Sequence, residues 1–250
     1  MKFSSHILKQ ISRVAMHSNL RGIPDHLSTN LRQSMKLCLV TNRQEKSFSW
    51  LMDVVEKAAK GGVTMVQLRE KDNIPDKDTI YLAELLLNIL KEFNVPLIIN
   101  DRVDICHITK AQGVHLGQSD MHPDKARKIL GDKAIIGLSL ENLEQAEIAN
   151  RLTSINYVAA SPVFHSNSKN DYNGLWGLQG LKELTQISKY PVMSIGGINL
   201  NNVSDIIGAG SKGVAVISAV QNQDNPELAA KLMYKEIDNS LRRYDNDRCR

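Results

Sequence analysis

From Lys36 onward the sequence repeats one unit: a short apolar run, a polar or glycine-containing turn, and a segment with helical spacing of apolar residues. Short apolar runs bounded by turn residues are typical of parallel strands buried on both faces. Eight such units predict an α/β fold of the closed (β/α)8 TIM-barrel type in a single domain. An open, doubly wound sheet is the alternative, and eight repeats argue against it. We expect the strands at residues 37–40, 64–68, 97–99, 113–117, 134–137, 157–160, 192–195 and 213–217.

Helices are predicted between these strands. Segment 48–60 has apolar residues at helical spacing and ends in Gly61-Gly62, where glycine permits a left-handed C-terminal cap. A last helix is expected to begin at Pro226, with Asn225 as its N-terminal cap. Further helices are expected at 78–93, 142–152 and 178–188.

Length and composition suit one soluble enzyme-sized domain. The chain has 250 residues, of which 42% are hydrophobic and 23% charged. Its net charge of +4 is small and lies partly in the chain ends, so we expect no nucleic-acid partner. No apolar run approaches membrane-spanning length, so we expect no membrane partner either. Cys38, Cys106 and Cys249 lack metal-site spacing, which favours reduced thiols and a cytoplasmic location. Whether the chain forms a homo-oligomer is left open.

The two chain ends differ from the repeating part. Residues 1–34 form a basic N-terminal extension with a single acid, Asp25. A transit peptide has this composition, but we favour a disordered arm or an upstream start codon with Met35 as the working start. The extension lacks the apolar core of a secretory signal, so export is not expected. We expect the barrel domain at 35–242 and a charged C-terminal tail at 243–250.

The third and fourth predicted strands both lead into carboxylates. Residues 97–99 are followed by Asn100 and Asp101, and the run ending at Gly117 is followed shortly by Asp120. The carboxyl ends of parallel strands share the rim where ligands bind, so Asp101 and Asp120 should meet there. Two carboxylates with water and phosphate oxygens suit Mg²⁺, which predicts a magnesium and diphosphate site. The alternative is that Asp101 caps the next helix and Asp120 is a loop residue.

Three other segments are candidates for anion binding. The second strand delivers Arg69 and Lys71 to the rim, and such cations suit diphosphate oxygens, although charged residues after a strand also form solvated loops. The loops after the seventh and eighth strands contain Gly196-Gly197 and Ser218, at the usual phosphate position of TIM barrels. The long loop 161–176 is rich in hydroxyls, and its length favours binding over a plain surface connection.

Several motifs occur in one fixed order: QLREK at 67–71, IIND at 98–101, GVHLGQSD at 113–120, IGLS at 136–139, SPVFHSNSK at 161–169, SIGGI at 194–198 and VISAV at 216–220. In this order and spacing the chain resembles the thiamine-phosphate synthases, roughly from Lys36 to Ile237. The resemblance implies a transferase of thiamine biosynthesis. It would condense 4-amino-2-methyl-5-(diphosphooxymethyl)pyrimidine with 4-methyl-5-(2-phosphooxyethyl)thiazole, giving thiamine phosphate and diphosphate. Mg²⁺ would assist this dissociative displacement.

The resemblance also implies roles for individual residues. Asp101 and Asp120 would bind Mg²⁺, and Arg69, Lys71 and Lys169 would act in catalysis by stabilising charge on the leaving group. The pyrimidine diphosphate would be bound by Gln67, Leu68, Arg69, Glu70, Lys71, Asn100, Ser139 and Lys169. The thiazole phosphate would be bound by Ser166, Asn167, Ser168, Gly197, Ile217 and Ser218.

Two alternatives to a synthase follow from the same resemblance. A related thiazole tautomerase is an isomerase on the same barrel, but it lacks the paired metal carboxylates that Asp101 and Asp120 provide. The other alternative is a non-catalytic, metabolite-binding homologue. It is raised by the loop 161–176, where Ser161 stands for the family's glycine and Ser166 and Ser168 stand for its threonines. Like threonine, serine at positions 166 and 168 has a hydroxyl group that can donate a hydrogen bond.

Overall fold

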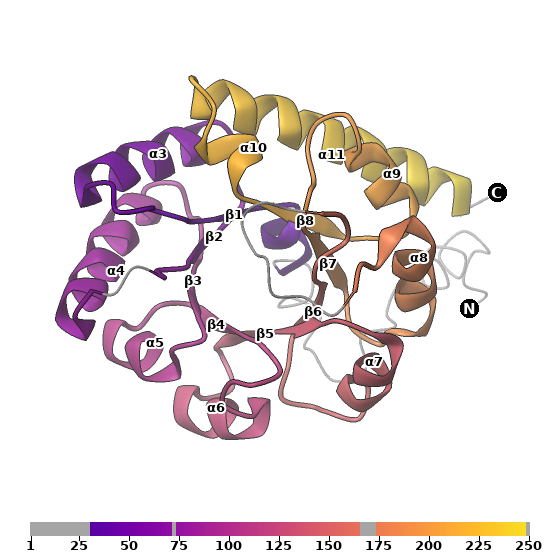
Figure 1. Ribbon diagram of the computed structural model, residues 1–250, viewed down its shortest axis with the longest axis horizontal. Helices are drawn as coiled ribbons and strands as arrows, with labels where there is room; N and C mark the ends of the chain where they lie inside the picture. The colour runs from indigo at the N-terminus through magenta and orange to yellow at the C-terminus, as the bar shows by residue number, and fades with distance from the viewer. Residues whose placement is uncertain (1–30, 72–73, 166–173, 249–250) are drawn as a thin grey trace, which may run out of the picture.

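The computed structural model describes residues 31–71, 74–165 and 174–248. Its strands form one closed parallel barrel in which each strand pairs with the next along the chain and β8 pairs with β1 (Figure 1). The strands are β1 (Leu37–Val40), β2 (Met65–Leu68), β3 (Leu97–Asn100), β4 (Gly113–Leu116), β5 (Ile135–Leu140), β6 (Tyr157–Ala160), β7 (Val192–Ile195) and β8 (Gly213–Val216). The prediction of a (β/α)8 TIM barrel is confirmed.

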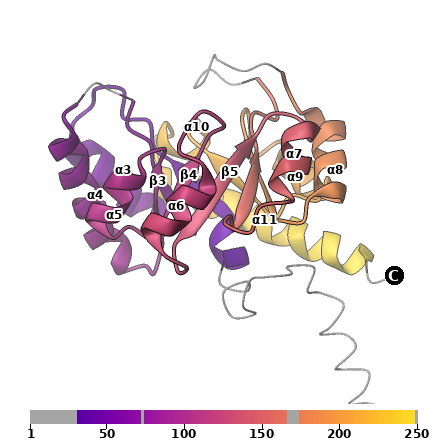
Figure 2. The ribbon, with the colours of Figure 1, turned by 90° about the horizontal axis from the view of Figure 1, so that it is seen from below.

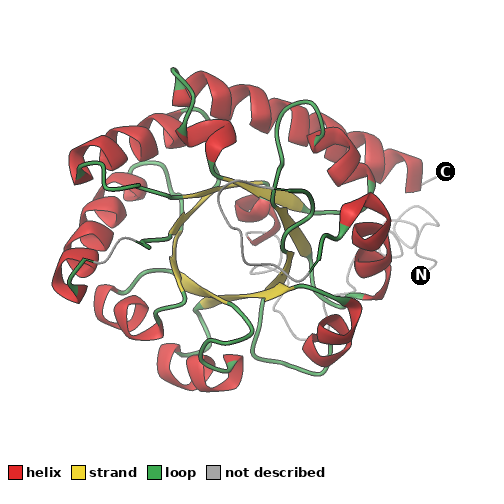
Figure 3. Ribbon diagram, viewed as in Figure 1, coloured by secondary structure: helices red, strands yellow, loops and turns green. Residues whose placement is uncertain are grey.

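Helices form a ring around the barrel, as the colouring by secondary structure shows (Figure 3). They are α3 (Phe48–Lys60), α4 (Asp76–Lys91), α5 (Val103–Thr109), α6 (Pro123–Leu130), α7 (Leu143–Ala149), α8 (Gly177–Ile187), α9 (Val203–Gly208), α10 (Ser218–Gln221) and α11 (Pro226–Arg248). Within the described ranges, no helix is both long and apolar enough to cross a membrane.

Element boundaries depart from the sequence predictions by a few residues. Helix α4 begins at Asp76, two residues before the predicted start. After α3 it is Gly62, with φ of 105°, and not Gly61 that adopts a positive φ. Strand β5 continues to Leu140, so Ser139 lies within the strand and not after it. The last difference matters most, because a strand fixes the direction in which the Ser139 side chain projects.

Apolar side chains form two layers of core. The outer layer lies between the strands and the helices, and it contains the outward-facing strand residues such as Leu68 and Val114. The inner layer fills the barrel with alternate strand residues, among them Cys38, Ile98 and the fully buried Tyr157. Alternation along each strand therefore decides which residues face the helices and which face the barrel axis.

A short helical segment, residues 31–35, closes one end of the barrel. Leu31 and Met35 are buried in the inner core layer, with exposed fractions of 6% and 0%. Figure 2 shows this segment at the opposite end of the barrel from α10. The described barrel thus includes residues before Met35, and they lie at the end opposite the one where the strands finish.

Candidate active site

The predicted site residues that the structure describes gather at the carboxyl ends of the strands. They come from the ends of β2, β3 and β5 and from the loops after β2, β3, β4, β7 and β8. The side chain of Leu68 points away from the site, because it is buried in the outer core layer. Only the main chain of Leu68 reaches the rim. Four predicted residues, Ser166, Asn167, Ser168 and Lys169, lie outside the described residues.

Asp101 is held at the rim by its backbone. Its φ of 63° is left-handed, a conformation that aspartate tolerates better than most residues, and its N–H donates to the carbonyl of His115 at 2.8 Å. Helix α5 has Arg102 at its N-cap and no side-chain cap. The alternative interpretation of Asp101 as a helix cap is therefore not supported, and its carboxylate is available to the site.

Asp120 faces Asp101 from the loop after β4. Its Oδ2 accepts a hydrogen bond from the Gly117 N–H at 2.6 Å, which fixes the carboxylate. Burial raises the pKa of Asp120, the Gly117 N–H lowers it, and the adjacent Asp101 carboxyl raises it again. Asp120 does lie in a loop, as the alternative interpretation expects, and the helix α6 that follows is capped by His122. The two carboxylates meet at the rim, as the strand order predicts.

The donor set fits Mg²⁺. Two facing carboxylates repel one another, and a divalent cation between them removes that repulsion while using hard oxygen ligands. In residues 31–71, 74–165 and 174–248, no larger cluster of His, Cys, Asp and Glu could hold a metal ion. Asp101 and Asp120 would thus be the protein ligands, and the remaining positions suit water and phosphate oxygens.

Two cations adjoin the carboxylates. Lys71 Nζ lies 3.1 Å from Asp101 Oδ2, with about half of its side chain exposed. Arg69 is more enclosed, and burial lowers the pKa of its guanidinium while the nearby Asp101 raises it. Its backbone N–H donates to the hydroxyl of the buried Thr41 at 3.0 Å. Because arginine keeps its proton in proteins, Arg69 brings a positive charge to the rim, beside the ion pair of Lys71 with Asp101.

Glu70 lies between these cations in the sequence but has a different environment. Its carboxylate accepts a hydrogen bond from Arg43 Nε at 2.8 Å, and only 8% and 5% of the Arg43 and Glu70 side chains are exposed. Arg43 also donates to the carbonyl of Lys46 at 2.5 Å. This buried pair ties the loop after β1 to the loop after β2 and neutralises the negative charge of Glu70.

Gly196 and Gly197 form a turn that only glycine accommodates well. Their φ angles are 105° and 65°, and a Cβ on Gly197 would lie 2.5 Å from the carbonyl oxygen of His165. The loop after β6 pairs with this turn, since Val163 N–H donates to the Ile195 carbonyl and Phe164 N–H to the Gly196 carbonyl. The two glycines thus allow the loop after β6 to pack against this turn, and they leave its backbone without covering side chains.

Ile217 and Ser218 introduce the short helix α10, of which Ser218 is the first residue. The helix is tied to the loop after β1 by the buried Gln221, whose amide makes two hydrogen bonds to the main chain of Asn42. They run from Asn42 N–H to Gln221 Oε1 at 2.9 Å and from Gln221 Nε2 to the Asn42 carbonyl at 2.7 Å. Sequence reasoning did not identify this contact, because it joins residues far apart in the chain.

Three further residues adjoin the site and were not predicted. His115 and Tyr157 form hydrogen bonds inside the barrel behind Ser139, and Gln118 Nε2 donates to the Ser139 carbonyl at 2.6 Å. Alternation in β4 could have revealed His115, because Val114 and Leu116 pack outward and the residue between them faces the barrel axis. A polar residue in that position calls for a polar partner.

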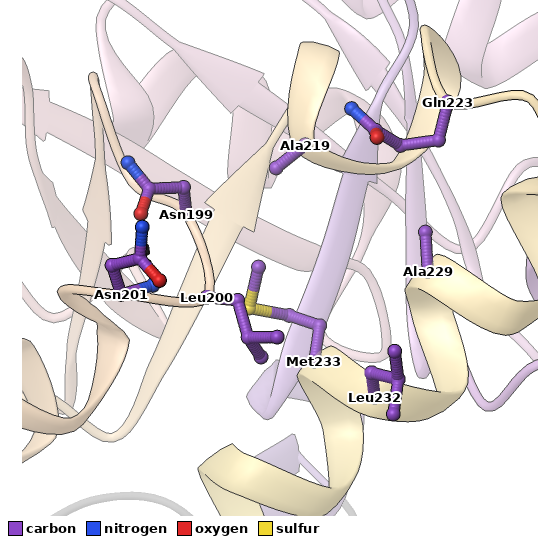
Figure 4. A pocket seen from close by; sticks show the side chains of 8 residues that line it. All are labelled: Asn199, Leu200, Asn201, Ala219, Gln223, Ala229, Leu232 and Met233. Carbon is purple, nitrogen blue, oxygen red and sulfur yellow. Dashed lines mark hydrogen bonds between the residues drawn. The ribbon is translucent and has the colours of Figure 1, made fainter.

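A separate pocket of about 270 Å³ lies between the loop after β7, α10 and α11 (Figure 4). Leu200, Ala219, Leu232 and Met233 supply its apolar walls, and Asn199, Asn201 and Gln223 its polar part. None of the residues predicted for the active site lines it. The carboxylates and cations described above are therefore a different site.

The family model described as thiamine monophosphate synthase matches residues 37–220. The chain belongs to the thiamine monophosphate synthase family. It is 42% identical over 198 residues to the thiamine-phosphate synthase of Clostridium novyi, an alignment covering 79% of this chain and 96% of that protein. It is 45% identical over 194 residues to that of Leptospira biflexa, covering 76% of this chain and 92% of the relative.

A solved structure gives the same result. The thiamine phosphate pyrophosphorylase from Pyrococcus furiosus superposes with a TM-score of 0.76 at 32% identity, covering 84% of this chain and 99% of that one. These likenesses identify the chain as a transferase enzyme of thiamine biosynthesis. They cover the barrel and all of the rim described above.

Proposed function

We propose that the chain condenses 4-amino-2-methyl-5-(diphosphooxymethyl)pyrimidine with 4-methyl-5-(2-phosphooxyethyl)thiazole to give thiamine phosphate and diphosphate. The observation that carries the proposal is the meeting of Asp101 and Asp120 beside Lys71 at the rim. The similarity to the thiamine-phosphate synthases of Clostridium novyi and Leptospira biflexa supports the same product, thiamine phosphate. The paired carboxylates support a synthase over the related thiazole tautomerase.

The bond that breaks joins the pyrimidine methylene carbon to a diphosphate oxygen, and the electron pair leaves with the diphosphate. The bond that forms joins the same carbon to the thiazole nitrogen. The aminopyrimidine ring is electron-rich, so it stabilises positive charge on the methylene while the leaving group departs. Because the attacking nitrogen carries a lone pair and no proton, the reaction needs no general base. The cations and carboxylates of the rim are therefore enough for this reaction, and no side chain has to act as a nucleophile or a base.

The chain's own residues would bind and neutralise the leaving group. Arg69 and Lys71 would place positive charge against the diphosphate oxygens as negative charge develops on them. Gln67 is the last residue but one of β2, and Asn100 is the last residue of β3, so their amides would hydrogen-bond to the same substrate. Asp101 and Asp120 would hold Mg²⁺, which when bound supplies further positive charge to the diphosphate.

Ser139 would contact the pyrimidine substrate from β5, and the resemblance adds Lys169. The thiazole phosphate would lie across the rim at Gly197, Ile217 and Ser218, where α10 begins. Ser166, Asn167 and Ser168 would complete its binding by the same resemblance. Buried free thiols at Cys38 and Cys106 also support a cytoplasmic location.

Purified protein with both substrates and Mg²⁺ tests the proposal. We expect thiamine phosphate and diphosphate to form in equal amounts, and EDTA to stop the reaction. Asp101→Ala should lower kcat about 100-fold, because it removes a metal ligand and the partner of Lys71. Circular dichroism and thermal melting should show an intact fold in that variant. A normal rate for Asp101→Ala would remove the metal assignment, and isomerisation of a thiazole phosphate without condensation would favour the tautomerase.

A further inference from the structure

A chain of hydrogen bonds leads from the rim into the barrel interior. Ser139 Oγ lies 2.9 Å from His115 Nε2, and His115 Nδ1 lies 2.9 Å from the hydroxyl of Tyr157. Tyr157 is fully buried, His115 is 7% exposed, and Ser139 is partly exposed at the rim. The reaction proposed above uses Ser139 and assigns nothing to the other two residues.

Strand register and one glycine make room for this chain. His115 in β4 and Tyr157 in β6 are both in register with Gly137 of β5, which lies between them. A Cβ on Gly137 would lie 2.6 Å from His115 Nδ1 and 2.5 Å from the Tyr157 hydroxyl oxygen. Ser139 is two residues further along β5, so its side chain is on the same inward face and one step closer to the rim. Glycine at position 137 thus allows the two side chains to meet across β5.

The burial of Tyr157 determines the direction of the hydrogen bonds. Burial raises the pKa of Tyr157 well above its ordinary value, so its hydroxyl keeps its proton. Within the described residues, the structure gives this hydroxyl one hydrogen-bond partner, His115 Nδ1. A buried hydroxyl proton needs an acceptor, so Nδ1 must accept it. A neutral imidazole then carries its own proton on Nε2, and that N–H donates to Ser139 Oγ.

With the hydrogen bonds in these directions, the hydroxyl proton of Ser139 points away from His115. Because Ser139 Oγ accepts from His115, its own proton is free to donate toward a ligand at the rim. The pyrimidine substrate offers acceptors in its ring nitrogens and its diphosphate oxygens. A serine that is free to rotate would donate and accept in turn, whereas this serine is fixed as a donor.

We propose that His115 is a positioning residue which, oriented by Tyr157, presents the Ser139 hydroxyl as a fixed hydrogen-bond donor to the pyrimidine substrate. The inference rests on the proposed function, which places Ser139 against that substrate. His115 and Tyr157 themselves touch no reacting atom.

A first test reads the imidazole directly and needs no turnover. In protein labelled with ¹⁵N-histidine and free of substrate, the spectrum of His115, assigned by its loss in His115→Asn, should show a protonated Nε2 and an unprotonated Nδ1. Protonation of Nδ1 instead would overturn the inference, because Ser139 would then have to donate to the imidazole. This outcome is independent of which reaction the enzyme catalyses.

A second test measures coupling between Tyr157 and Ser139. Tyr157→Phe keeps the ring in the core and removes only the hydroxyl, which should lower kcat/KM for the pyrimidine substrate about ten-fold. In the Ser139→Ala background the same substitution should have no further effect, since the residue through which it acts is gone. The KM for the thiazole phosphate should stay unchanged in both backgrounds.

A matched control is available in Tyr190, whose hydroxyl is also hydrogen-bonded, to the carbonyl of Leu152 outside the site. Tyr190→Phe should leave kcat/KM unchanged. If Tyr157→Phe lowers activity equally with and without Ser139, its role is structural and the inference fails while the proposed function stands. If Ser139→Ala retains full activity, the assignment of Ser139 fails and the inference fails with it.

Discussion

At the scale of single residues, Asp120 combines a functional position with an energetic cost. Its folded-state pKa is raised by burial and by the neighbouring Asp101, so ionisation of this carboxylate opposes folding in the metal-free protein. Stability therefore falls as pH rises from the unfolded pKa of aspartate through the higher folded pKa. The site holds a charge that the fold alone would not favour, which is common for residues that bind a ligand.

Asp120→Asn should consequently stabilise the metal-free protein near neutral pH. Asparagine keeps an oxygen that can accept from the Gly117 N–H, and it removes the charge that faces Asp101. Because Asp120 is only partly buried, solvent screening limits the gain to at most about 1 kcal/mol. Urea unfolding in EDTA would measure it, and Mg²⁺ titration should show weakened binding in the same variant. A loss of stability in EDTA would contradict this account of Asp120.

The sequence could predict the meeting of Asp101 and Asp120, because parallel strands of a barrel all finish at one rim. Asp101 directly follows β3, and Asp120 lies in the short loop after β4. It could not predict the Ser139, His115 and Tyr157 chain, which depends on the register between β4, β5 and β6. Register is set by packing of the whole barrel, and it leaves no local pattern in the sequence.

At the scale of elements, the contact between α10 and the loop after β1 is the one whose removal should be most informative. Gln221→Ala would leave the Asn42 N–H and carbonyl without their partner, at a cost of about 1 to 3 kcal/mol. Since Ser218 begins the same helix, the KM for the thiazole phosphate should rise more than the KM for the pyrimidine substrate. Steady-state kinetics with each substrate varied in turn would measure this.

Gln179→Ala in α8 is the matched control, since that exposed glutamine bonds only to Glu183 on its own helix among the described residues. It should change neither stability nor either KM. Equal effects of Gln221→Ala on both substrates would show that α10 does not hold the thiazole phosphate in particular.

The helical segment 31–35 gives a second prediction at this scale. It closes the end of the barrel opposite the rim, and Leu31 is buried there against the inner core. A chain that begins at Met35 should be about 2 kcal/mol less stable than one that begins at residue 31, from the loss of one buried leucine. Both should have the same kcat. Leu31→Ala in the full chain should reproduce the loss of stability, and equal melting temperatures for the two truncated chains would contradict the role of this segment.

The segment 31–35 before the first strand was harder to interpret from sequence than the strands were. Strand positions follow from short apolar runs between turn residues, and these signals are local. The burial of Leu31 follows only from the shape of the barrel that is built afterwards, because one leucine among basic and hydroxyl residues carries no periodic pattern. The same reason applies to the Arg43 and Glu70 ion pair, whose members belong to different loops.

At the scale of the whole molecule, the barrel is closed where its first strand meets its last strand and last helix. Lys36, directly before β1, donates to Asp238 of α11 at 2.8 Å, and Arg242 on the next turn of α11 contacts the same carboxylate. The hydrogen bond from Lys36 holds the pKa of Asp238 below its ordinary value, with Arg242 adding to the effect. A carboxyl with a depressed folded-state pKa stabilises the fold above its unfolded pKa, and this contribution is lost as pH falls through the folded pKa.

Asp238→Asn should therefore lower the free energy of unfolding at neutral pH, by at most about 1 kcal/mol because the pair lies near the surface. The difference from the unsubstituted protein should shrink as pH falls below the ordinary range of aspartate and as salt is added. Urea midpoints measured across that pH range would test it, with Asp224→Asn as control, since this exposed aspartate has no ion-pair partner among the described residues. A difference that persisted at acid pH would show that Asp238 acts through packing and not through charge, and barrel closure would then rest on the β1 and β8 pairing and the apolar contacts of α11 alone.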